Sequence, residues 1–110
     1  MTLFEDFLQI LSEDLKTLAE EYGRDYSRVL LKAGTDFARE TRTDLERWAR
    51  LLASGQLTEA DFKWLLKGKK DLMEMELLKQ EGLSMAHKDR LQQALINTIA
   101  GAVIKTLQAG

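Results

Sequence analysis

The chain contains no cysteine, no proline and only one histidine in its 110 residues. Without cysteine it has no disulfide, no thiolate metal site and no cysteine nucleophile, and this fits the cytoplasmic location that we expect. Without proline, no predicted helix is forced to bend or end at a residue that lacks an N–H group. The most apolar run, residues 94–104, is 11 residues long. Because a membrane-spanning helix needs about 20 apolar residues, no stable membrane insertion is expected.

A strong charge of either sign is also missing, since the net charge is −2. No overall electrostatic field attracts the chain to nucleic acid, and no nucleic-acid partner is expected. The charges are unevenly distributed, however. Residues 1–23 carry six acids and one base, whereas residues 82–110 carry three bases and one acid. This opposition of charge predicts that the two segments are neighbours.

What the sequence does contain is helical periodicity. Apolar residues recur at spacings of three and four along four segments, and no segment alternates with a period of two over more than a few residues. The first predicted helix runs from about Leu3 to Tyr22. Thr2 and Glu5 have the spacing of a capping box, and Gly23 is the expected stop because glycine accepts a left-handed conformation.

Three further helices are predicted. They cover residues 25 or 27 to 54, 58 to 80, and 84 to 108. The second is long enough that Gly34 is a position where it could bend or split in two. The third begins at the N-cap Thr58 and has a weak point at Gly68, since glycine costs about 1 kcal/mol relative to alanine inside a helix.

Short connections make successive helices antiparallel neighbours, as in an up-and-down bundle. The sequence therefore predicts an all-α fold in which residues 1–110 form a single domain. We expect an antiparallel bundle of four to five helices with the C-terminal helix most buried. Residues 57–72 resemble segments of small bacterial helical proteins, and the resemblance implies no function.

The last predicted helix is apolar on two adjacent faces, an arc wider than one stripe. A helix that is apolar over most of its circumference is buried over most of it. Because a chain this small cannot easily surround such a helix, we expect the helix to pack on a second copy, in a homodimer or homotetramer. The residues expected at this interface are Leu95, Ile96, Ile99, Ala100, Val103, Ile104 and Leu107, with Trp64 from the edge of the third helix's apolar stripe.

No pattern of residues indicates a catalytic, cofactor-binding or metal-binding site. A di-iron bundle needs Glu-x-x-His on two helices, and the only histidine, His87, has Ser84 three residues before it. We interpret His87 as a partly exposed polar residue near a helix start, because no nucleophile or carboxylate lies at a useful spacing from it. The sequence therefore predicts neither an enzyme nor a bound cofactor.

Two groups of basic residues are interpreted as solvated helix surface. On the second helix the arginines alternate with acids, and the expected surface ion pairs are Glu46–Arg50 and Asp44–Arg47. Residues 67–70 hold three lysines around one glycine, without the spacing of a phosphate-binding loop.

These observations favour a non-enzymatic interaction or assembly module that self-associates through its C-terminal helix. The alternative is a small-molecule or lipid carrier with an apolar pocket between the third and fourth helices. Its expected lining is Met73, Met75, Ile99 and Val103. Reversible membrane attachment through the last helix is a third hypothesis, and only three bases on that helix favour it.

Overall fold

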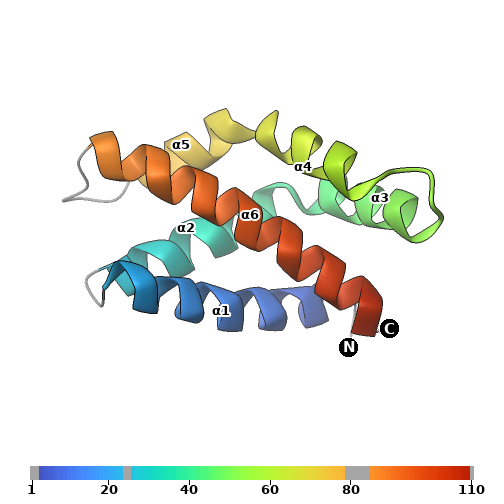
Figure 1. Cartoon of the computed structure of the whole chain (residues 1–110), viewed down its shortest axis with the longest axis horizontal. Helices are drawn as coiled ribbons and strands as arrows, with labels where there is room; N and C mark the ends of the chain where they lie inside the picture. Colours follow the sequence, from blue (N-terminus) through green and yellow to red (C-terminus); the bar gives the residue numbers. More distant parts are fainter. Residues whose placement is uncertain (1–2, 24–25, 79–84, 110) are drawn as a thin grey trace.

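The computed structural model describes residues 3–23, 26–78 and 85–109, with only the backbone described at 76, 78, 85–88 and 109. Its elements are α1 (Leu3–Tyr22), α2 (Ser27–Glu40), α3 (Arg42–Ala53), α4 (Glu59–Lys67), α5 (Lys70–Leu78) and α6 (Met85–Ala109). The chain crosses the length of the molecule four times in alternating directions (Figure 1). The first and last crossings are α1 and α6, and between them come α2 with α3 and α4 with α5. The all-α prediction is confirmed. The predicted number of helices is wrong, because two predicted segments are each broken into two helices.

The first break lies at Thr41, whereas α2 continues without interruption through Gly34. Thr41 is buried, and its Oγ1 donates a hydrogen bond to the carbonyl oxygen of Phe37 at 2.8 Å. A threonine that bonds back to the preceding turn bends a helix. Phe37 of α2 and Leu45 of α3, on either side of the break, are both buried in the core.

The second break lies at Gly68 and Lys69, so the predicted weak point is where the helix divides. Thr58 caps α4 as predicted, because its Oγ1 accepts a hydrogen bond from the Asp61 N–H at 3.1 Å. The predicted stop at Gly23 is also confirmed by its φ of 102°. Thr2, the first residue of the predicted capping box, lies outside the described residues.

The core is one apolar cluster to which all six helices contribute, and α6 supplies seven of its buried side chains. These are Leu91, Leu95, Ile96, Ile99, Ala100, Ala102 and Val103. Helices α1 and α6 pack extensively together, as their opposite charges predicted. Lys105 Nζ lies 3.0 Å from Asp14 Oδ1, an ion pair that joins these two helices directly.

Helices α1 and α2 approach closely at Gly34. A Cβ atom at this position would lie 2.8 Å from Cδ1 of Leu15 and 3.4 Å from Cδ2 of Leu95. Gly34 itself is buried, and both leucines are fully buried. The missing side chain therefore sets how closely α2 packs on α1 and α6.

Candidate functional site: an apolar groove and a charge-free helix face

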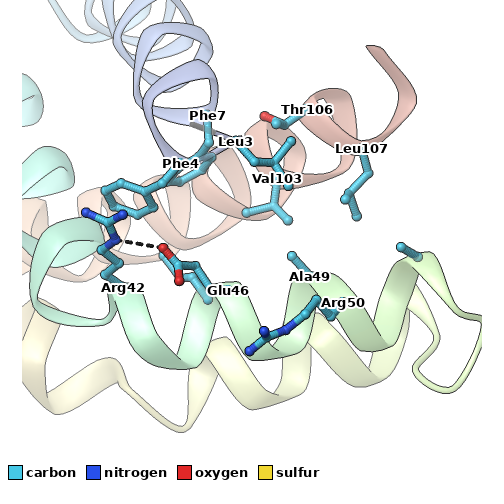
Figure 2. Close-up of a pocket in the computed structure, with 12 residues that line it drawn as sticks. Leu3, Phe4, Phe7, Arg42, Glu46, Ala49, Arg50, Val103, Thr106 and Leu107 are labelled. Atoms are coloured by element: carbon cyan, nitrogen blue, oxygen red, sulfur yellow. Dashed lines mark hydrogen bonds and ion pairs between the residues drawn. The ribbon is translucent and has the colours of Figure 1, made fainter. Parts of the chain in front are cut away.

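A groove of about 430 Å³ lies at the end of the molecule where α1 begins and α6 finishes, with α3 as its third wall (Figure 2). Its apolar lining is Leu3, Phe4, Phe7, Leu45, Ala49, Ala53, Val103 and Leu107, and its polar lining is Arg42, Glu46, Arg50 and Thr106. The groove remains open because α3 presents the small side chains of Ala49 and Ala53 one and two turns after Leu45. Larger residues at these two positions would fill the space between α3 and α6.

The charged rim of the groove contains the ion pair of Arg42 with Glu46, and a further base, Arg50, that is not part of this pair. Arg42 Nε lies 2.6 Å from Glu46 Oε1, and the Arg42 guanidinium also stacks 4.4 Å from the centre of the Phe4 ring. The predicted Glu46–Arg50 pair is therefore wrong, since Glu46 pairs with the arginine one turn earlier instead. No carboxylate of the described residues lies within ion-pair distance of Arg50.

The remaining polar group in the groove is already satisfied. Thr106 is buried, and its Oγ1 donates a hydrogen bond to the carbonyl oxygen of Ala102 at 2.7 Å. Across the described part of the chain, no group of three or more histidine, cysteine or carboxylate residues has the arrangement needed to hold a metal ion. The side chain of His87 lies outside the described residues.

The predicted interface residues fall into two sets. Five of them are buried within one chain: Leu95, Ile96, Ile99, Ala100 and Val103. Helices α1, α4 and α5 all pack on α6, and together they cover both of its apolar faces. Ile104 and Leu107 are half-buried, and Trp64 is 72% exposed on α4. Trp64 lies on the side of α4 opposite Phe62 and Leu66, which face the core.

The outward face of α6 is the second feature of interest. Residues 91–104 contain no charged side chain, although 31% of the whole chain is charged. At 1.5 Å per residue, this stretch is about 21 Å long. Its outward positions are exposed or half-buried, and most of them are small: Gln93, Ala94, Asn97, Thr98, Gly101 and Ile104. The interface was predicted on the apolar side chains of the same helix. The outward face is instead marked in the sequence by the absence of charged residues between 91 and 104.

The four residues expected to line a carrier pocket are not brought around one cavity. Met73 and Ile99 are fully buried, whereas Met75 is 56% exposed. Val103 lines the groove described above, together with residues of α1 and α3. The small residues Ala49 and Ala53, four and eight residues after Leu45, are the sequence signal that would have located the groove.

An ion-pair cluster ties α3 to the junction of α4 and α5. Asp44 Oδ1 lies 2.7 Å from Arg47 Nη2, as predicted, and Asp44 Oδ2 lies 2.8 Å from Lys69 Nζ. Asp44 and Lys69 are far apart in the sequence. The lysine-rich segment 67–70, predicted to be solvated surface only, therefore also makes a tertiary contact. The hydrogen bond from Lys69, with the charges of Lys69 and Arg47, outweighs desolvation and holds the pKa of Asp44 below its ordinary value.

Asp44→Asn is expected to lower the free energy of unfolding at pH 7 by at most about 1 kcal/mol, because the pair is partly exposed. A pKa that is depressed in the folded state contributes stability above the unfolded-state value and loses it as pH falls through the folded-state value. The difference between wild type and Asp44→Asn should therefore shrink as pH drops below about 4. Urea denaturation from pH 7 to pH 3 measures this difference, and a constant difference would contradict the assignment.

Compared with protein-family models, with curated proteins and with solved structures, the chain shows no significant match to any of them. Among the described residues, no helix combines the length and apolar character needed to cross a membrane.

Proposed function

We propose that the protein is a non-enzymatic assembly module that forms a homodimer through the outward face of α6. The observation that carries this proposal is that no outward position of residues 91–104 is charged, although 31% of the whole chain is charged. Charged residues are depleted at the centre of protein interfaces, because each one must be desolvated on binding. A surface that lacks them over four helical turns is suited to contact with protein.

A second copy of α6 is the partner that this face fits best. Gly101, Ala94 and Thr98 have small side chains, and small side chains at the contact allow two helices to approach closely. A two-fold axis through the middle of the stretch, near Asn97, would place the same uncharged surface on both sides. The amide of Asn97 would then face its own copy and form hydrogen bonds across the interface.

This proposal changes which residues of the C-terminal helix make the interface. Ile104 remains in it, whereas Leu95, Ile99 and the other buried residues stabilise the single chain. Trp64 points away from the core on α4. Its substitution therefore tests whether the interface lies on α4 instead of on the outward face of α6.

Thr98→Arg is expected to weaken self-association at least tenfold, because it places a charge on the outward face of each copy. Sedimentation equilibrium from micromolar to hundreds of micromolar protein measures the dissociation constant. Met75→Arg is the matched control, since Met75 is an exposed apolar residue on α5, and it should leave the constant unchanged. If Trp64→Ala or Met75→Arg weakens the dimer while Thr98→Arg does not, the interface lies elsewhere.

A further inference from the structure

We infer that the groove between α1, α3 and α6 binds a free medium-chain carboxylate, such as a fatty acid. Its volume of about 430 Å³ lies in the range of small-molecule sites, which is about 300–1,000 Å³. Its walls are apolar side chains from three helices, with Phe4, Val103 and Leu107 on the α1 and α6 sides (Figure 2). Such walls suit a hydrocarbon chain better than a sugar or a nucleotide, whose many polar groups would face apolar side chains.

The charge of the rim decides which end group the ligand carries. Arg42 forms an ion pair with Glu46 and stacks on the Phe4 ring, so the charges of Arg42 and Glu46 already compensate one another. Arg50 lies on α3 two turns after Arg42, lines the same groove, and has no ion-pair partner among the described residues. Among the described residues, other exposed bases also have no ion-pair partner, but Arg50 differs from them because it borders an apolar groove.

A carboxylate is the anion that suits this arrangement. The planar guanidinium of arginine binds a carboxylate through two parallel hydrogen bonds, and its exposed side chain is free to turn over the groove. An amphipathic ligand would place its chain against Ala49 and Val103 and its carboxylate at Arg50. A cationic or uncharged head group would leave Arg50 without a partner.

The groove and the proposed dimer surface lie on different sides of α6. Val103 and Thr106 face the groove, whereas Asn97 and Gly101 face outward. Ligand binding therefore does not depend on self-association, and either proposal can fail alone.

The test is isothermal titration calorimetry with decanoate and decyltrimethylammonium below their micelle concentrations and with decanol below its solubility limit. Decanoate should bind with a dissociation constant below about 1 mM, and more tightly than the other two. Methyl NMR should place it in the groove, with the largest shift changes at Ala49 and Val103. Equal affinity for all three ligands, or shift changes away from the groove, would overturn the inference.

Two exposed substitutions separate the charge from the fold. Arg50→Gln should weaken decanoate binding about tenfold and leave decanol binding unchanged. Ala53→Glu should weaken the binding of both decanoate and decanol, because the larger side chain fills part of the groove. Its carboxylate, one turn from Arg50, should weaken decanoate binding further. Arg47→Gln is the matched control on the same helix, since Arg47 pairs with Asp44 and does not line the groove.

Binding of phosphatidylglycerol vesicles without binding of decanoate would assign the surface to a membrane and overturn the inference. Unchanged decanoate affinity in both Arg50→Gln and Ala53→Glu would also overturn it, because the carboxylate would then not contact Arg50.

Discussion

Leu95→Ala is expected to lower the free energy of unfolding by about 3 kcal/mol, within the range of about 2–5 kcal/mol for such truncations in protein cores. Leu95 is fully buried in the middle of α6, and its Cδ2 lies close to Gly34 of α2. The truncation leaves a cavity where α1, α2 and α6 meet. A domain of this size has a total stability of about 5–15 kcal/mol, so the loss is a large fraction of it.

The matched control is Leu107→Ala, on the same helix but half-buried at the groove. It should cost about 1 kcal/mol, because only part of the side chain leaves water on folding. Urea denaturation at one low protein concentration measures both variants. If Leu95 formed an intermolecular contact instead, Leu95→Ala would change the oligomeric state while the stability of the single chain stayed the same.

Gly34→Ala is expected to destabilise the fold by about 1–2 kcal/mol, although alanine is the better helix former by about 1 kcal/mol. The added methyl group would lie 2.8 Å and 3.2 Å from the two Cδ atoms of Leu15. Leu15 is fully buried, so its side chain must shift against other core residues to make room for the methyl group. Overpacking of a tight core costs about 1–3 kcal/mol and outweighs the gain in helix propensity.

Gly101→Ala is the control for this substitution, because a Cβ at Gly101 would have no heavy atom within 4 Å. It should stabilise the single chain by about 0.5–1 kcal/mol through helix propensity alone. Both variants are compared by urea denaturation at low micromolar protein. A stabilised Gly34→Ala would show that α1 and α2 separate easily, which contradicts the close packing described here.

The helical class and the ends of α1 were predictable because they depend on local signals. Apolar periodicity placed α1 at Leu3–Tyr22, and Gly23 and Thr58 marked a stop and a start correctly. The break at Thr41 was not predictable, because threonine is tolerated in helices. The hydrogen bond from Thr41 Oγ1 to the Phe37 carbonyl oxygen, which accompanies the break, is seen only in the structure.

The candidate sites depend on how the helices pack, and the sequence pattern is ambiguous there. An apolar arc on α6 predicts burial equally well against its own chain or against a second copy. In the structure α1, α4 and α5 cover that arc, which leaves the uncharged side outward. The groove arises because Ala49 and Ala53 meet the C-terminal end of α6, a long-range contact that periodicity on a single helix does not reveal.

The central claim is that two copies pack α6 against α6, and single-cysteine cross-linking tests it most directly. The chain has no native cysteine, so each variant carries one thiol. Cysteine is placed in turn at Ala94, Asn97 and Gly101, with Met75→Cys as the exposed control on α5. A disulfide requires Cα atoms about 4.4–6.8 Å apart, which only a residue near the two-fold axis satisfies. We predict that at least one α6 variant oxidises to a dimer of twice the 12.6 kDa chain mass and that Met75→Cys does not. If none of the three α6 variants forms a disulfide-linked dimer under mild oxidation, or if all of them cross-link no faster than Met75→Cys, the claim is contradicted.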